Sequence, residues 1–264
     1  MDFTLSTYRL LLTSLLNAGY STYTFQEWCE GKAQGRYVIL RHDVDLKAKQ
    51  SLATAKIEAS LGIKSSYYFR VVPQSNQPEI ITAIADLGHE IGYHYEDLSI
   101  FKGDCAKALQ HFETQLCYFR QFYPVKTICM HGSPSSKWDN KDLWKSNDYR
   151  DYGIIGEPYF DLLNNRHIAP KVLYLTDTAR MWDGERYSVR DKVLDNQIEI
   201  SHQGKPIHTT FELIDWLGTH PDQEVIMITT HPQRWTDNIV EWYQELILQW
   251  PKNLVKKMIF VKNS

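Results

Sequence analysis

Short apolar runs alternate along the chain with longer stretches in which apolar residues recur at helical spacing. A continuous run of apolar and β-branched residues is typical of a strand that is buried on both faces. RYVILR at 36–41 and EVIMITT at 224–230 are clear examples. The pattern predicts seven strands, at residues 36–41, 66–72, 89–94, 125–131, 152–157, 172–176 and 224–230.

Helical spacing of apolar residues predicts helices between these strands, and a glycine or proline follows several of them, as is usual at helix ends. These helices are predicted at residues 50–61, 78–87, 104–122, 211–217 and 236–250. Near the N-terminus, the apolar run from Leu10 to Leu16 is followed by Gly19 and predicts an amphipathic first helix. The last stretch, 254–261, is compatible with either a helix or a strand.

Strands of this kind, separated by helices, indicate an α/β protein in which helices cover a parallel sheet. No GxGxxG follows the first predicted strand, which argues against a dinucleotide-binding sheet. We therefore expect an irregular (β/α) barrel of about seven parallel strands. The predicted organisation is one catalytic domain over residues 1–264, with residues 1–35 as a helical N-terminal extension packed on it.

Composition and charge exclude several other classes of protein. The chain has 264 residues, of which 29 are Lys or Arg and 32 are Asp or Glu, so it lacks the basic excess of a nucleic-acid-binding protein. Its four cysteines form no CxxC pair, which argues against a cysteine-based zinc site or a disulfide framework. The N-terminus has no basic segment before its apolar run, so we expect neither a signal peptide nor a membrane span, and we predict a cytoplasmic protein.

Ionisable residues gather where the predicted strands end. In β/α barrels the carboxyl ends of the strands form the active-site face, so side chains from distant parts of the sequence should meet there. The candidates, in chain order, are Arg41, Asp43, Asp45, Arg70, His94, Glu96, His131, Glu157, Asp177 and His231.

Asp43 and Asp45 are separated by one residue, so on an extended segment their side chains point to the same side. Two adjacent carboxylates repel each other unless a cation or a shared proton relieves them, which suits one metal ligand and one general base. A solvated turn with an aspartate capping the next helix is the structural alternative. His94, beside Glu96, adds an imidazole of the kind that zinc prefers, whereas His89 begins the same strand and is expected to be structural.

These segments resemble motifs of the polysaccharide deacetylase family, the NodB-like carbohydrate esterases. RHDVD at 41–45 resembles the first motif, GHEIGYH at 88–94 the second, and ITTHPQRW at 228–235 the last. The resemblance implies a divalent metal, zinc with cobalt or manganese as alternatives, bound by Asp45 and His94. It also implies that Asp43 is the catalytic base and that His231 protonates the leaving group. His231 as a structural residue of its loop is the alternative.

The sequence departs from the family pattern at two places. The second metal-binding histidine of the GHEIGYH motif would fall at Leu98, which cannot bind a metal. An Arg-Pro motif is replaced by HGSP at 131–134. We therefore expect His131 to be the third ligand, with Glu96 as the alternative and a hydrogen-bonded turn residue as the structural interpretation of His131.

The predicted function is metal-dependent hydrolysis of a C–N amide bond other than a peptide bond, with N-deacetylation of an amino sugar or glycan precursor as the preferred reaction. An amidase acting on a small non-sugar molecule and a catalytically inactive carbohydrate-binding barrel are the alternatives. Asp177 is expected to orient His231 or to contact the substrate. The residues predicted to bind substrate are Arg41, Arg70, Glu157, Arg180 and Trp182, and Trp138 and Trp235 are further candidates for stacking on a sugar.

Overall fold

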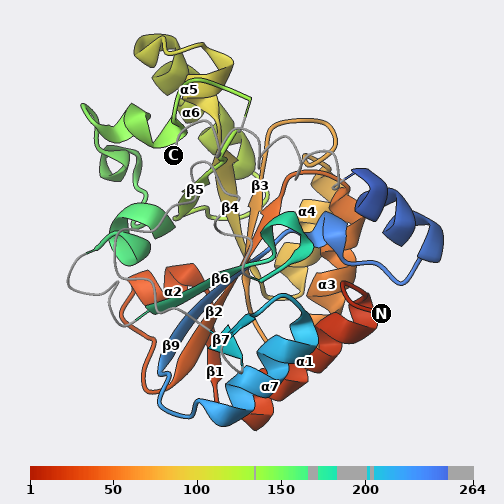
Figure 1. Cartoon of the computed structure of the whole chain (residues 1–264). Coiled ribbons are helices and arrows are strands. Elements are labelled where there is room, and N and C mark those ends of the chain that lie inside the picture. The colour runs from red at the N-terminus through yellow and green to blue at the C-terminus, as the bar shows by residue number, and fades with distance from the viewer. Residues whose placement is uncertain (134, 166–171, 183–200, 203–204, 249–264) are drawn as a thin grey trace.

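The computed structural model describes residues 1–133, 135–165, 172–182, 201–202 and 205–248, and its main element is a sheet of seven parallel strands (Figure 1). The strands are β1 (Ser21–Tyr23), β2 (Tyr37–Val44), β3 (Ser66–Phe69), β4 (Glu90–Tyr95), β5 (Ile128–Met130), β6 (Val172–Thr176) and β9 (Val225–Thr230). Their order is β5-β4-β3-β2-β9-β6, and β1 pairs with the first half of β2. All of these pairs are parallel.

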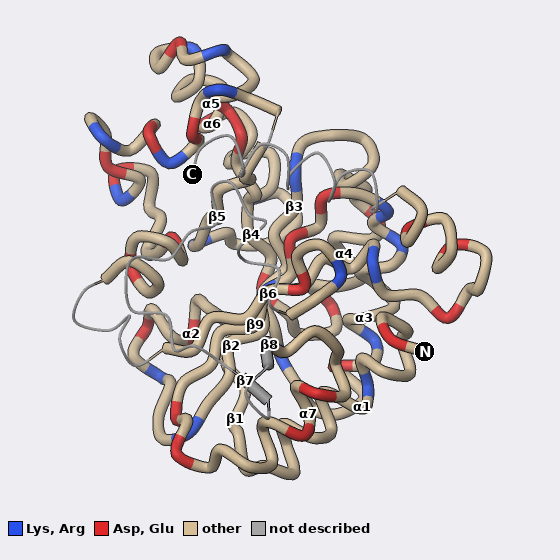
Figure 2. The backbone as a smooth tube through the Cα atoms, in the orientation of Figure 1, with Lys and Arg blue, Asp and Glu red and all other residues tan. Residues whose placement is uncertain are grey.

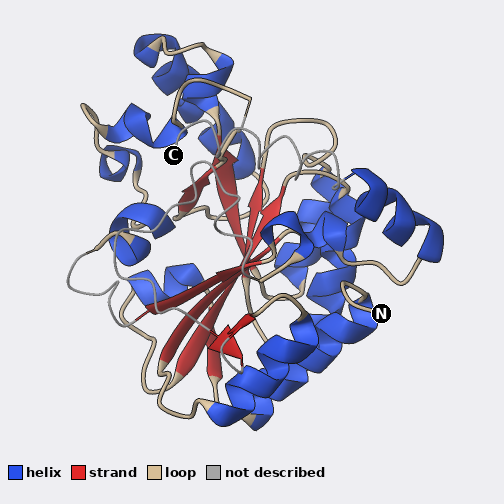
Figure 3. Cartoon of the chain, viewed as in Figure 1, coloured by secondary structure: helices blue, strands red, loops and turns tan. Residues whose placement is uncertain are grey.

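The sheet is curled, and its two outer strands, β5 and β6, are not paired with each other in the described part of the chain. The π-helix η3 (Pro158–Leu163) contacts both β5 and β6 and lies between these edges. Helices surround the strands (Figure 3). The architecture is that of an irregular, incompletely closed (β/α) barrel, so the predicted fold class is confirmed.

The α-helices of the described residues are α1 (Leu5–Asn17), α2 (Phe25–Cys29), α3 (Ala48–Ser60), α4 (Pro78–Asp86), α5 (Asp97–Ile100), α6 (Cys105–Phe119) and α7 (Thr210–Thr219), followed by a helix over 239–248. Helix α1 packs against α3 and α7, and α3 packs against α4. These four helices lie together on one side of the sheet (Figure 1).

Shorter elements complete the described chain. The 3-10 helices are η1 (Asn140–Trp144), η2 (Tyr149–Tyr152), η5 (Thr178–Arg180) and η7 (Pro232–Arg234), and β7 (Ser201–His202) pairs antiparallel with β8 (Lys205–Pro206). No helix among the described residues is both long and apolar enough to cross a membrane. Basic and acidic residues are interspersed along the described chain (Figure 2).

Two hydrophobic clusters of buried side chains form the core. Successive side chains of a strand point to opposite faces, so β2 contributes Ile39 to one cluster and Val38 and Leu40 to the other. All three side chains are buried. Burial on both faces explains why β2 is a continuous apolar run rather than an alternating one.

One predicted strand is wrong, and three short observed strands, β1, β7 and β8, were not predicted. Residues 152–157 contain only an isolated bridge, between Gly156 and Thr127. Gly153 has φ +70° and ends η2, and Gly156 lies so close to Cys29 that a Cβ there would approach the thiol sulfur to 2.4 Å. The seventh strand is instead β1, whose three residues are too few to produce a recognisable pattern.

The other predicted elements that fall on described residues are found, most of them with shifted ends. The helix predicted at 236–250 begins at 239, because the Asn238 side chain accepts hydrogen bonds from the backbone of Val240 and Glu241 and so caps it. Its last two predicted residues, and the stretch 254–261, lie outside the described residues. The segment predicted at 172–176 is β6.

A buried polar cluster lies between β2 and the helices that cover it. Glu58 of α3 accepts hydrogen bonds from Tyr67 at 2.7 Å, from Ser65 at 2.6 Å and from the Tyr8 hydroxyl. Its Oε1 also lies 2.7 Å from His42 Nε2. We call these five residues the Glu58 cluster. All are buried.

Candidate metal centre and catalytic residues

Ionisable side chains from five strands meet at one edge of the sheet. Because the strands run parallel, their carboxyl ends face the same side of the barrel. Each residue lies near the end of a strand or directly after it, in chain order Asp43 and Asp45 at β2, His94 at β4, His131 at β5, Asp177 at β6 and His231 at β9. The structure therefore brings together the ligand, base and acid candidates that the sequence predicted.

Two histidine nitrogens lie next to one carboxylate oxygen of Asp45. We call Asp45, His94 and His131 the Asp45 triad. Asp45 Oδ1 lies 3.6 Å from His94 Nε2 and 3.5 Å from His131 Nε2. Among the described residues, this oxygen is buried and has no hydrogen-bond partner. A buried acceptor without a donor costs free energy, so a further group is needed to satisfy it.

The orientation of both imidazoles leaves a nitrogen lone pair facing Asp45. His94 Nδ1 lies 2.9 Å from the carbonyl oxygen of Cys129, which can only accept, so Nδ1 carries the proton. His131 Nδ1 lies 2.9 Å from Glu96 Oε2 and donates to it. With neutral rings, both Nε2 atoms are then acceptors, and three acceptors face one another. This is the arrangement of metal-binding histidines whose second nitrogen is held by the protein.

Glu96, the alternative ligand, is engaged by other groups. Arg70 donates to both of its oxygens, with Nε and Nη2 each at 2.8 Å, and His131 Nδ1 donates to Oε2. Burial raises the pKa of the Glu96 carboxyl, but His131 and Arg70 outweigh this effect and lower the pKa to about 2. The structure thus places Glu96 behind His131 and pairs Arg70, a predicted substrate-binding residue, with Glu96.

Asp43 forms a bidentate ion pair with Arg41. Arg41 Nε donates to Oδ1 at 2.8 Å and Nη2 donates to Oδ2 at 2.6 Å. Burial raises the pKa of the Asp43 carboxyl, but the Arg41 guanidinium and the His94 imidazole outweigh it and hold the pKa below its usual value. Asp43 Oδ2 is 3.8 Å from His94 Nε2, so the ionised carboxylate borders the triad. Arg41, also predicted to bind substrate, is 1% exposed.

A second group of donor atoms overlaps the Asp45 triad. Asp43, His94 and Cys129 are buried and offer ligand atoms that lie within 4.8 Å of one another, so this group could also hold a metal ion. Both oxygens of Asp43 already accept hydrogen bonds from Arg41, whereas Asp45 Oδ1 accepts none. The Asp45 triad is therefore the group with an unused carboxylate oxygen.

His231 is held by Asp177. Its Nδ1 lies 2.6 Å from Asp177 Oδ1, and its backbone amide donates to Oδ2 at 2.9 Å. Burial raises the pKa of the Asp177 carboxyl, but the Arg234 guanidinium and His231 outweigh it and lower the pKa to about 2. An ionised Asp177 fixes the imidazole so that Nε2 faces the triad, 3.9 Å from Asp45 Oδ2.

Three predicted substrate-binding residues are occupied by contacts within the protein. Glu157 is fully buried, and its carboxylate accepts hydrogen bonds from the backbone amides of Met130, Tyr159 and Phe160. Burial raises the pKa of Glu157 to about 7. The Arg180 guanidinium packs over the Phe3 and Trp242 rings, and Trp182 is 2% exposed with its indole donating to Thr210.

The structure adds Arg234 and Gln233 to the site, which the sequence analysis did not assign to it, and gives Trp235 a different role from the predicted one. Arg234 donates to Asp177, and Trp235, predicted as a stacking residue, is fully buried and donates to Asp177 Oδ2 at 2.8 Å. Gln233 Nε2 lies 3.5 Å from Asp45 Oδ2. These three residues directly follow His231 and Pro232 in the motif THPQRW, so their position in the motif was the available signal.

Comparison with known proteins identifies little that resembles this chain. No protein-family model matches the sequence, and no curated protein matches it. Among solved structures, the chain is similar to a CE4 family pseudoenzyme from Bacillus anthracis, with a TM-score of 0.43 and 11% sequence identity. The similarity covers 83% of this chain, and the chain spans 65% of the length of that structure. Similarity at this level carries neither the activity nor the inactivity of one protein over to the other.

Proposed function

We propose that this protein is a metal-dependent hydrolase that cleaves a C–N amide bond other than a peptide bond. The observation that carries the proposal is the buried Oδ1 of Asp45, which has no hydrogen-bond partner among the described residues and faces two histidine nitrogens that are acceptors in the neutral rings. The base and acid candidates border the triad, with Asp43 Oδ2 3.8 Å from His94 Nε2 and His231 Nε2 3.9 Å from Asp45 Oδ2. A site that only bound carbohydrate would not need this combination.

The donor atoms fit a divalent cation. Carboxylate oxygen and imidazole nitrogen are zinc ligands, and a tetrahedral ion bound at about 2.0–2.1 Å separates its ligand atoms by roughly 3.3–3.4 Å. The two Asp45–histidine separations of 3.6 and 3.5 Å approach that value. Asp45, His94 and His131 would hold the ion, and zinc is the first choice, with cobalt or manganese as alternatives. Glu96 and the Cys129 carbonyl would orient the two histidines.

A bound cation would polarise the acyl carbonyl and lower the pKa of a water molecule beside it. Asp43 would accept a proton from that water as its oxygen attacks the acyl carbon, because the carboxylate is ionised and fixed by Arg41. Protonated His231 would donate a proton to the nitrogen as the C–N bond breaks, so that the amine leaves as a neutral group. Asp177 accepts a hydrogen bond from His231 Nδ1 and fixes the direction of the imidazole.

N-deacetylation of an amino sugar or glycan precursor is the reaction we favour. Its support is the similarity of RHDVD, GHEIGYH and ITTHPQRW to polysaccharide deacetylase motifs. Those motifs contain the base, two ligands and the acid, whereas the third ligand, His131, belongs to a segment that differs from the family pattern. We propose that His131 from β5 replaces the histidine that would otherwise stand at Leu98.

Metal content and acetate release test the proposal together. Protein purified without chelator and then incubated with zinc should contain about one ion per chain by elemental analysis, and His94→Ala should lose it. His220→Ala is the matched control, because His220 stacks on Trp216 and hydrogen-bonds to its carbonyl oxygen, contacts distinct from those of the triad. A panel of N-acetylated amino sugars, assayed with zinc, cobalt and manganese, should then yield a substrate. Wild-type protein that stays metal-free would refute the metal-dependent mechanism.

A further inference from the structure

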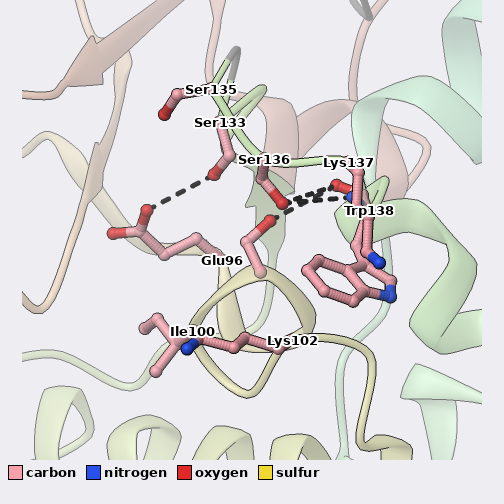
Figure 4. A pocket seen from close by; sticks show the side chains of 9 residues that line it. Glu96, Ile100, Lys102, Ser133, Ser135, Ser136, Lys137 and Trp138 are labelled. Carbon is pink, nitrogen blue, oxygen red and sulfur yellow. Dashed lines mark hydrogen bonds between the residues drawn. The ribbon is translucent and has the colours of Figure 1, made fainter.

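An open pocket lies next to the Asp45 triad and shares a wall with it. Its volume is about 510 Å³, and it lies between α5 with the turn that follows it and the loop after β5 (Figure 4). Glu96 lines the pocket and also accepts the hydrogen bond of His131 Nδ1. Ser133, a second lining residue, donates to Glu96 Oε2 at 3.4 Å. A ligand in this pocket would therefore lie beside the groups that support the metal centre.

Two lysines give the pocket a positive charge. Lys102 and Lys137 both line it and are exposed, and Figure 4 shows Lys102 beside Ile100 and Lys137 beside Trp138. Within the part of the chain that the structure describes, neither lysine forms an ion pair with a carboxylate. Glu96 is the acidic residue in the wall, and its charge is matched by the bidentate contact with Arg70. Lys137 Nζ lies 4.4 Å from the centroid of the Trp138 ring, and this cation–π contact does not neutralise its charge, so both ammonium groups can attract an anion.

The wall that carries Trp138 is held in place by close packing. Gly103 has φ +88°, and a Cβ at this position would lie 2.1 Å from Trp138 Nε1, so only glycine allows the indole to approach. The Ser136 hydroxyl accepts a hydrogen bond from the Trp138 amide at 3.1 Å, and Ser99 donates to the Trp138 carbonyl at 3.3 Å. These contacts join α5 to the loop after β5, so the pocket does not require a ligand to bring its two sides together.

We propose that this pocket binds a phosphate group of the substrate, which makes the substrate a phosphorylated N-acyl amino sugar. The proposal rests on the hydrolase function proposed above and specifies its substrate. The ammonium groups of Lys102 and Lys137 can each donate to an oxygen of the phosphate, and charge-assisted hydrogen bonds of this kind are the strong ones. The indole of Trp138 also lines the pocket beside Lys137, whose Nζ lies 4.4 Å from its ring centroid, and adds apolar surface for contact with the sugar.

Binding measurements on the full-length protein test the phosphate site without requiring turnover. The probes are N-acetylglucosamine, its 1-phosphate and its 6-phosphate, each titrated by calorimetry. At least one phosphate should bind about tenfold or more tightly than the unmodified sugar, the scale of a gained charge-assisted hydrogen bond. The two phosphates distinguish the end of the sugar that enters the pocket. Added salt should reduce the preference, because the lysines are exposed.

Variants then assign the preference to the two lysines. The double variant Lys102→Gln/Lys137→Gln should lose it, whereas Lys145→Gln should keep it, because Lys145 is exposed and pairs with Asp142 outside the pocket. Gly103→Ala should weaken the binding of all three probes by displacing Trp138. Equal affinity for the sugar and both phosphates, or a preference that survives in the double variant, would overturn the proposal.

The outcome is separable from that of the hydrolase proposal. Phosphate-dependent binding by a wild-type protein that takes up no metal and releases no acetate would support the pocket and refute the hydrolase. Acetate release from sugars with no dependence on phosphate would support the hydrolase and overturn the phosphate site.

Discussion

Two buried groups of histidines and carboxylates flank the same strand, and they differ in how completely their polar atoms are satisfied. His42 and Asp43 are neighbours on β2, so their side chains point to opposite faces of the sheet. His42 joins the Glu58 cluster beneath the helices, whereas Asp43 borders the Asp45 triad at the mouth of the barrel.

The Glu58 cluster is closed. Both carboxylate oxygens of Glu58 have hydrogen-bond donors, and His42 also contacts Thr230 through its other nitrogen at 2.6 Å. Each of the five side chains therefore has a hydrogen-bond partner within the described part of the chain. A network satisfied in this way contributes to the stability and specificity of the core.

In the Asp45 triad, by contrast, not every polar atom has a hydrogen-bond partner among the described residues. Its separations of 3.5 and 3.6 Å exceed hydrogen-bond length, and Asp45 Oδ1 is buried without a partner among the described residues. The same residue types therefore serve two purposes, and the unfilled space between acceptors, rather than the presence of histidine and carboxylate, marks the functional group. This contrast predicts that changes at the Asp45 triad and its neighbours affect metal binding and catalysis, whereas changes in the Glu58 cluster affect folding.

The largest effect is expected when the two aspartates at the end of β2 are replaced one at a time. Asp43→Asn should lower turnover by about 10²–10⁴-fold, the usual scale for a general base, and should retain the metal. Asp45→Asn should lose the metal, because an amide is a weaker ligand than a carboxylate. Elemental analysis beside a rate assay distinguishes the two, and equal loss of metal in both variants would show that the roles are assigned wrongly.

His231→Ala should reduce the rate for an alkyl amide by about 10²–10⁴-fold, because the departing amine needs a proton. An activated anilide, whose nitrogen leaves more readily without protonation, should be affected much less. Steady-state rates on both substrates, with metal content as a control, measure the difference. A uniform loss on both substrates would indicate that His231 positions the substrate instead of donating a proton.

Changes in the Glu58 cluster should affect folding and leave the metal in place. Glu58→Ala should lower the free energy of unfolding by about 3–5 kcal/mol, because it leaves the buried partners of Glu58 without their acceptor. If this variant does not fold, Glu58→Gln should fold with a smaller loss, about 1–3 kcal/mol. Urea denaturation measures both. Glu113→Ala, at an exposed position of α6, should change the value by less than about 0.5 kcal/mol.

The smallest effect concerns the pH dependence of stability. Burial raises the pKa of Glu58, but His42, His89 and the Ser65 hydroxyl outweigh it and lower the pKa from 4.5 to about 2. The ionised carboxylate therefore stabilises the folded state above about pH 4.5, and this contribution is lost as the pH falls towards 2. The free energy of unfolding should fall more steeply in this interval for the wild type than for Glu58→Gln. If the free energy of unfolding depended on pH in the same way in both proteins, Glu58 would not be the cause of the loss of stability in acid.

Much of the sheet could be predicted because its strands are buried on both faces, and such strands consist of continuous runs of apolar residues. Strand β6 coincides with the predicted segment, and β2 and β9 differ from theirs only at the ends. The stretch 152–157 also contains apolar residues, but it does not form a strand. Gly153 allows a left-handed turn there, and Gly156 allows a close approach to Cys29. Those contacts depend on the tertiary structure and leave no periodic signal.

The sequence by itself determined the residue types at the strand ends, and parallel topology then required Asp45, His94 and His131 to share one edge of the sheet. Only the tertiary structure decided which polar side chains would be satisfied. Glu157 and Trp182 are residue types that often bind substrates. In the fold, Glu157 instead accepts hydrogen bonds from backbone amides, and the Trp182 indole donates to the Thr210 hydroxyl. The physical reason is that hydrogen bonding and burial depend on the distances between distant segments. For the same reason His42, adjacent to Asp43 in sequence, has its ring nitrogens bonded within the protein, while Asp45 Oδ1 has no partner in the part of the chain that the structure describes.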